Sequence, residues 1–206
     1  VVFGNPIFFH LDKINQISDK KTIYKKFNLN PTKKIILFTT SKYQGPSEKY
    51  DYDIKVWRYL LKYFSNSHDI YLVLKPHPNE NITKYQEILR EFTTSNSKII
   101  SGNLIELLQV CDIVISNFST AIVDSICLNK PVIEVKWPGI RQIPFEEHGV
   151  IIQSKLEDLA SAIKNMDSIE IKDNLFQIRE IFLKEHYNIP FNKSKLENVL
   201  KELLNC

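Results

Sequence analysis

The chain has 206 residues, of which 43% are hydrophobic and 25% charged, and its formal net charge is +3. This composition is typical of a globular protein with a sizeable core, and so small and dispersed a charge argues against a nucleic-acid partner. No run approaches the roughly eighteen apolar residues of a membrane span. The three cysteines, Cys111, Cys127 and Cys206, lack metal-ligand spacing. They indicate a reducing compartment, so we expect a cytoplasmic protein.

Strand and helix patterns alternate along the chain. The expected elements are a helix at 18–27, a strand at 34–40, a helix at 53–64, a strand at 70–75, a helix at 82–92, a strand at 98–100, a helix at 103–111, a strand at 112–116, a helix at 120–128, strands at 131–135 and 149–152, and a helix at 156–166. Two amphipathic helices close the chain, the last with a leucine-rich stripe from Leu196 to Leu204. The strands are apolar without alternation, as in sheets covered on both faces. The alternation predicts an α/β, Rossmann-like parallel sheet of about six strands with helices on both faces.

The chain divides into three expected parts. Residues 1–33 form a linker and a short helix, 34–168 the Rossmann-like domain, and 169–206 helices that pack back on that domain or on a preceding one. Gly4-Asn5-Pro6 is typical of a turn after a strand, so we expect the sequence to be a fragment whose amino-terminal partner domain precedes it.

The first informative motif is Lys75-Pro76-His77-Pro78, which directly follows the strand at 70–75. Ligands of open α/β sheets bind outside the carboxyl ends of the strands. The two prolines restrict the backbone on both sides of His77, whose imidazole can donate a hydrogen bond to a phosphate oxygen. The alternative is a loop histidine in a proline turn, or a histidine that caps a neighbouring helix. We favour the phosphate role because of the paired prolines at a strand end.

The second motif is Ser116-Asn117-Phe118-Ser119-Thr120, where the strand at 112–116 turns into a helix. Unpaired backbone N–H groups at such a turn favour an anion, and the hydroxyls of Ser119 and Thr120 add donors. The alternative is an ordinary helix N-cap. Asp124 lies four residues after Thr120 on the same helical face, where it can accept hydrogen bonds from a ribose or remain a solvated carboxylate.

Weaker candidates lie in the loops at the same edge. A donor could be contacted by the loop residues Thr40, Ser41, Lys42 and Arg141, and a ribose or base by Ser101 and Gly102. For each, a plain polar loop is the alternative. Asp51-Tyr52-Asp53 has the D-x-D spacing of metal-dependent transferases, but acidic residues commonly stand at helix starts. We therefore expect no metal. No glycine-rich phosphate motif occurs among the five glycines.

On these residues the sequence resembles the carboxyl-terminal, donor-binding half of GT-B-type glycosyltransferases. The likeness is to bacterial surface-polysaccharide enzymes: sialyl-, polysialyl- and Kdo-transferases and CDP-glycerol glycerophosphotransferases. His77-Pro78 matches their HP motif, Ser119-Thr120 their SS/ST motif, and Asp124 their following acidic residue. The resemblance covers nearly the whole chain. It implies that His77, Ser119 and Thr120 bind the phosphate of a CMP-, CDP- or UDP-linked donor, with no other cofactor.

The resemblance also implies partners. We expect the general base and the glycan or lipid-linked acceptor site in an amino-terminal half of the same protein, so the fragment alone should be inactive. A place at the inner membrane face, within a membrane-associated complex, would suit capsule polysaccharide biosynthesis.

Two alternatives stay open. Non-hydrolysing UDP-GlcNAc 2-epimerases share the fold and a related histidine, although the glycine-serine pattern of those enzymes does not occur at 116–119. The other alternative is a non-catalytic α/β nucleotide-binding or interaction domain.

Overall fold

The fold is one fully parallel sheet with the strand order β3-β2-β1-β4-β5-β6. The structure, a computed structural model, describes residues 19–41, 52–117, 119–136, 145–187 and 201. Its strands are β1 (Lys34–Thr39), β2 (Ile70–Lys75), β3 (Ser97–Ile99), β4 (Ile113–Ser116), β5 (Val132–Val135) and β6 (Ile152–Ser154). The helices are α2 (Lys20–Phe27), α4 (Tyr52–Phe64), α5 (Thr83–Glu91), α6 (Leu104–Val110), α7 (Ala121–Cys127), α8 (Leu159–Asn165) and α9 (Ile169–Phe182), followed by the π-helix η2 (Leu183–Tyr187). The predicted α/β class and six-stranded parallel sheet are confirmed.

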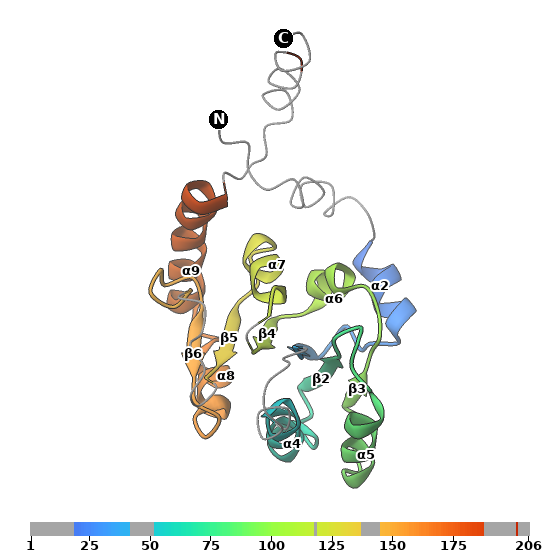
Figure 1. The fold of residues 1–206 in the computed structure, drawn as a ribbon. Helices are drawn as coiled ribbons and strands as arrows, with labels where there is room; N and C mark the ends of the chain where they lie inside the picture. The colour runs from blue at the N-terminus through green and yellow to red at the C-terminus, as the bar shows by residue number, and fades with distance from the viewer. Residues whose placement is uncertain (1–18, 42–51, 118, 137–144, 188–200, 202–206) are drawn as a thin grey trace.

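Helices cover both faces of the sheet, with α2, α6 and α7 on one side and α4, α5 and α8 on the other (Figure 1). Strand β1 shows why its sequence is apolar without alternation. Ile35 and Leu37 enter the core beneath α2 and α6, whereas Ile36 and Phe38 enter the core above α4. Because successive side chains point to opposite faces, a strand that is covered twice must be apolar throughout.

Local signals set the helix ends. Helix α2 ends where Asn28 takes the left-handed conformation, at φ 50°. Helix α6 begins after Asn103, whose side chain accepts a hydrogen bond of 2.9 Å from the Ile105 N–H. This bond satisfies one of the N–H groups that a helix leaves unpaired at its start.

The sixth strand lies later than expected. The apolar run 149–152 predicts a strand there, but β6 begins at Ile152, and the helix after it begins at Leu159 rather than 156. Gly149 closes a turn at φ 67°, and its N–H donates to the Glu146 carbonyl. Val150 and Ile151 are buried in the core beside α7 and α9 before pairing with β5 starts. Val150 and Ile151 are therefore apolar because they are buried, although they do not pair with β5, and this is why the sequence predicted a strand there.

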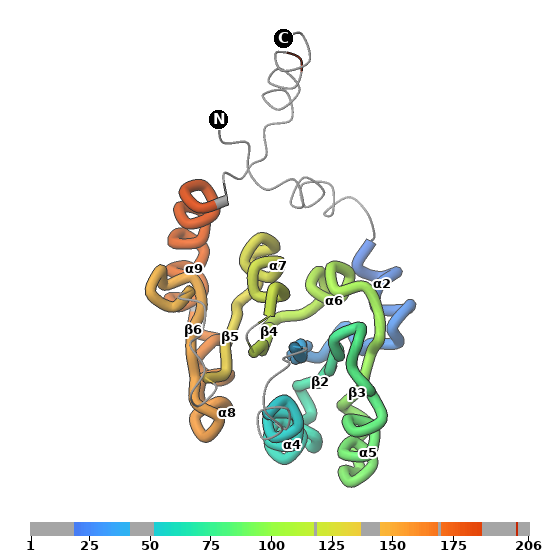
Figure 2. The backbone as a smooth tube through the Cα atoms, viewed as in Figure 1, coloured from blue at the N-terminus to red at the C-terminus, as the bar shows by residue number. Residues whose placement is uncertain are grey.

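Helix α9 passes from one face of the sheet to the other. In Figure 2 the tube of α9 rises from the side of α8 toward that of α7, next to β6 and β5. Accordingly, Ile171 and Leu175 pack in the α4–α8 core, while Ile178 and Phe182 pack in the α2–α7 core. The predicted leucine stripe at 196–204 lies outside the described residues. Within the described ranges, every helix is too short or too polar to cross a bilayer.

Candidate functional site

The sheet has a topological switch point between β1 and β4, because the chain proceeds outward from β1 in both directions. At the end of β1, Thr39 is in register with Lys75 on β2 and with Ser116 on β4. The hydroxyl of Thr39 also donates to the Ser116 hydroxyl at 2.8 Å. The loops that follow these three strands therefore leave the same edge side by side, where α/β folds form ligand crevices.

A pocket of about 320 Å³ lies at this edge. It is lined by Thr39, Thr40, Lys75, Pro76, His77, Pro78, Gly102, Leu104, Ser119, Thr120 and Ala121. The structure thus brings together both motifs, which are some forty residues apart in the sequence, along with the candidates Thr40 and Gly102. The roles assigned to these residues remain predictions.

The backbone of His77 is anchored on one side of this pocket. Its N–H donates to the Thr40 hydroxyl at 2.9 Å and to Glu80 Oε2 at 3.1 Å. Its Nδ1 accepts a hydrogen bond of 3.2 Å from the Asn79 N–H. Because Nδ1 acts as an acceptor, the neutral ring carries its proton on Nε2. The half-buried imidazole can therefore offer a donor through its far nitrogen.

The hydroxyls on the facing loop are also available as donors. Helix α7 starts at Ala121, one residue later than predicted, and the exposed Thr120 makes no side-chain capping bond. Ser119 Oγ accepts from the Ala121 N–H at 3.2 Å, which leaves its proton free to be donated. The ordinary capping interpretation thus holds in part for Ser119 and not for Thr120.

Lys75 is a pocket residue to which the sequence reasoning gave no role. Its ammonium donates to the Pro76 carbonyl at 3.2 Å and forms no ion pair among the described residues. Burial lowers the pKa of Lys75. A half-buried cation beside His77 favours an anionic ligand. The position of Lys75 as the first residue of the Lys75–Pro78 motif was the sequence signal that could have identified it as a pocket residue.

Glu80 joins the ends of β1 and β2 behind the pocket. Its carboxylate accepts hydrogen bonds from the Thr40 hydroxyl, the His77 N–H and the Tyr85 hydroxyl. Burial, then the nearby carboxylates of Asp53 and Glu80, raises the pKa of Tyr85, so that the phenol remains a donor. This network holds the His77 backbone in place.

Asp53 joins the ends of β1 and β4. Its buried carboxyl accepts hydrogen bonds from the Asn117 amide and, at 3.2 Å, from the Ser41 N–H. Burial raises the pKa of Asp53 to about 7, against the opposing hydrogen bond from Asn117. As half of a D-x-D sequence Asp53 suggested a helix cap, yet it fastens two loops to each other. No sequence signal indicated that partnership, because Asn117 is 64 residues away.

Other predicted residues do not line the pocket. Half-buried Asp124 lies one turn into α7, and burial raises its pKa. Exposed Ser101 and the loop residue Ser41 lie outside the lining. Lys42, Arg141 and Asp51 lie outside the described residues. Among the residues that are described, no three His, Cys, Asp or Glu side chains gather as a metal site would require.

Solved structures resemble this fold closely. The UDP co-structure of MnaA from S. aureus has a TM-score of 0.68 and 18% identity, covering 100% of this chain and 53% of that one. UDP-GlcNAc 2-epimerase from Neisseria meningitidis, bound to UDP-GlcNAc, has a TM-score of 0.65 and 17% identity, with coverages of 89% and 54%. The wall teichoic acid polymerase TagF has a TM-score of 0.63 and 18% identity, with coverages of 100% and 51%.

These likenesses establish the fold, and the chain spans about half the length of each protein. A comparison with curated proteins finds no match. The sequence itself is more specific, because residues 9–137 match the family described as CDP-glycerol:poly(glycerophosphate) glycerophosphotransferase. That match covers more than half of the chain and includes both pocket motifs. The chain therefore belongs to the CDP-glycerol:poly(glycerophosphate) glycerophosphotransferase family, with the fold of a GT-B half.

Proposed function

We propose that this chain is the donor-binding half of a transferase that builds a bacterial surface polymer from a nucleotide-activated donor. The observation that carries the proposal is the switch-point pocket, where Lys75, His77 and the Ser119-Thr120 hydroxyls meet in a member of a glycerophosphotransferase family. A cation, an imidazole and two hydroxyls around one cavity suit the phosphates of such a donor.

In this proposal the pocket stabilises the departing nucleotide phosphate. Negative charge grows on that phosphate as the glycosyl or glycerol-phosphate group leaves. Lys75 and His77 Nε2 would offer donors to it from one wall, and Ser119 and Thr120 from the facing wall. Donors that are already in position need no reorganisation during the reaction, so they lower the barrier. These groups would stabilise the negative charge of the departing phosphate without a metal ion.

The donor is most naturally a CDP-linked alcohol, because the family description names CDP-glycerol. Gly102 at the pocket wall would let the backbone approach the ribose or base. The general base and the acceptor site would lie in a second half of the protein, since the chain spans about half of the GT-B structures it resembles.

A sugar-nucleotide epimerase is the second candidate. The fold is at least as similar to MnaA and the Neisseria meningitidis epimerase as to TagF. The two functions differ in their requirement for an acceptor. Conversion of UDP-GlcNAc to its 2-epimer without acceptor, by the whole protein, would favour the epimerase.

Calorimetric titration of the chain with CDP, UDP, CMP and cytidine tests the proposal. We expect CDP to bind more tightly than CMP, since a second phosphate adds charged hydrogen bonds, each worth about 1.5–3 kcal/mol. Cytidine should bind weakest. UDP binding as tight as CDP would leave the pocket as a phosphate site without a cytosine preference. No binding by any nucleotide in the millimolar range would overturn the proposal.

A further inference from the structure

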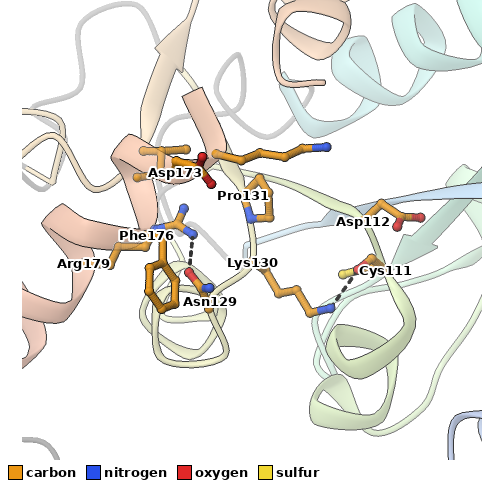
Figure 3. A pocket seen from close by; sticks show the side chains of 10 residues that line it. Cys111, Asp112, Asn129, Lys130, Pro131, Asp173, Phe176 and Arg179 are labelled. Atoms are coloured by element: carbon orange, nitrogen blue, oxygen red, sulfur yellow. Dashed lines mark hydrogen bonds between the residues drawn. The ribbon is translucent and has the colours of Figure 1, made fainter. Parts of the chain in front are cut away.

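A second cavity lies at the opposite edge of the sheet, where β4 and β5 begin and α9 crosses. Its volume is about 340 Å³. It is lined by Cys111, Asp112, Asn129, Lys130, Pro131, Lys172, Asp173, Leu175, Phe176 and Arg179 (Figure 3). None of these residues lines the switch-point pocket. Because the strands are parallel, their amino ends lie a full strand length from the nucleotide site.

Arg179 is the unusual residue of this amino-edge cavity. Its side chain comes from α9, and the residue is only 3% exposed. Its Nε donates to the Val150 carbonyl at 2.9 Å and its Nη1 to Asn129 Oδ1 at 3.4 Å. Its Nη2 is buried without any hydrogen-bond partner, and no carboxylate pairs with the guanidinium among the described residues.

An uncompensated buried charge is expensive. Moving a guanidinium out of water costs several kcal/mol unless an anion and hydrogen bonds offset that cost. Burial accordingly lowers the pKa of Arg179 to about 10. Asp173 lines the same cavity but forms no ion pair with Arg179. The fold thus holds a donor and a positive charge in place, and among the described residues no carboxylate forms an ion pair with it.

The charged groups that line the cavity are three cations, Arg179, Lys130 and Lys172, and two carboxylates, Asp112 and Asp173. Lys172 is on its rim, with a side chain 46% exposed and Nζ 3.6 Å from Asp167. Lys130 donates to the carbonyls of Gln109 and Cys111, which places its charge at the base of β5. Against the three cations stand Asp112, which already accepts from the Ile35 N–H at 2.7 Å, and Asp173.

We propose that the amino-edge cavity binds a small organic phosphate. Its phosphate would accept hydrogen bonds from Arg179 Nη2 and from the Asn129 amide nitrogen, because Asn129 Oδ1 is already taken by Arg179. Lys172 would approach from the rim. Phe176, which is 45% exposed, and Pro131 give an apolar wall for the organic part. The planar guanidinium suits phosphate oxygens better than a halide. The inference does not depend on the nucleotide site.

The test is a titration of the ¹⁵N-labelled chain with glycerol phosphate, a monoester, and with bis-glycerol phosphodiester, at constant ionic strength set by chloride. We expect saturable shifts of the backbone amides of Asn129 and Lys130 in the millimolar range. Tighter binding of the monoester would indicate a free metabolite, and tighter binding of the diester a segment of polymer. If neither phosphate shifts these amides beyond what chloride does, the proposal is wrong.

Three variants assign the shifts. Arg179→Met removes the donor while keeping an apolar filling, and should weaken phosphate binding by about tenfold or more, as loss of a charged hydrogen bond does. Lys172→Glu reverses a charge on the rim and should weaken phosphate binding more than the control below does. This variant decides the matter if Arg179→Met does not fold. The matched control Lys184→Glu, at an exposed position beyond α9, should stay within about twofold.

His77→Ala separates the two cavities. The shifts of the Asn129 and Lys130 amides should persist in this variant, because His77 lines only the switch-point pocket. Their disappearance would mean that phosphate reaches only the nucleotide site, which would overturn the amino-edge proposal. Failure of nucleotide binding alone, with these shifts intact, would overturn the proposed function instead.

Discussion

His77 shows how the structure turns a motif into a directed donor. The prolines on either side restrict its backbone, but it is Asn79 that fixes the direction of the ring, by donating to Nδ1. The proton is then on Nε2, the nitrogen that Asn79 does not occupy. A histidine held in this way loses little freedom when an anion binds, which favours a phosphate-binding role.

The variant His77→Ala should therefore discriminate between ligands. We expect affinity for CDP to fall by about tenfold or more, the effect of losing one charged hydrogen bond, and affinity for cytidine to change less than about twofold. Calorimetry with both ligands measures the difference. Equal losses for CDP and cytidine would contradict a phosphate role for the imidazole.

Asp53 should make stability depend on pH. Its pKa of about 7 in the folded chain exceeds the ordinary 3.8, so the folded state binds the proton more tightly than the unfolded state. The resulting stability is fully present below pH 4 and is lost as pH rises to about 7. A difference of that size corresponds to about 4 kcal/mol.

Asp53→Asn should remove this dependence. Relative to the unmodified chain, the variant should gain about 4 kcal/mol in unfolding free energy between pH 4 and pH 8. Urea unfolding at several pH values measures it. Asp158→Asn, at an exposed position before α8, serves as the control and should keep the original slope. A variant curve parallel to that of the unmodified chain would show that the Asp53 carboxyl does not titrate in this range.

At the scale of elements, the ends of strands and helices decide where side chains lie. Asn103 and Ser168 occupy the same position, immediately before a helix, but only Asn103 makes a side-chain capping bond. Gly102 precedes Asn103 at the pocket wall, and a Cβ added there would lie 2.8 Å from Phe27 Cε1. The start of α6 is thus tied to both the pocket and α2.

Asn103→Ala should lower the free energy of unfolding by about 1 kcal/mol, because one backbone N–H of α6 loses its partner. Ser168→Ala is the matched control and should cost a few tenths of a kcal/mol at most, since its side chain makes no capping bond. Denaturant unfolding of the two variants compares them. Equal costs would show that the Asn103 bond contributes nothing beyond local propensity.

At the scale of the whole molecule, the chain corresponds to one half of two-part structures. From the proposed function it follows that the chain alone binds CDP but transfers no glycerol phosphate from CDP-glycerol to an acceptor. A reading frame that adds the second half should restore transfer. Release of the nucleotide on acceptor addition measures both. Turnover by the isolated chain at the rate of the longer protein would contradict a general base in the other half.

The sequence by itself determined the α/β class and the parallel sheet. A strand such as β1, which is covered on both faces, must be apolar throughout. Helix α4 needs an apolar stripe, which is formed by Val56, Trp57, Leu60, Leu61 and Phe64. Both patterns involve residues close together in the sequence, so they can be recognised without the structure. The two pocket motifs could also be recognised in the sequence, because each directly follows a predicted strand. The start of β6 could not be recognised, since buried Val150 and Ile151 satisfy the same apolar pattern without pairing.

Only the tertiary structure decided which side chains meet. Asp53 and Asn117 are 64 residues apart in the sequence, and Glu80 and Thr40 are 40 residues apart. Arg179 and its partner Asn129 are 50 residues apart. The order of the strands in the sheet, and not their order along the chain, brings these residues together. Such polar contacts leave no periodic trace in a sequence. These contacts depend on how the loops at the sheet edge and helix α9 pack in the folded chain.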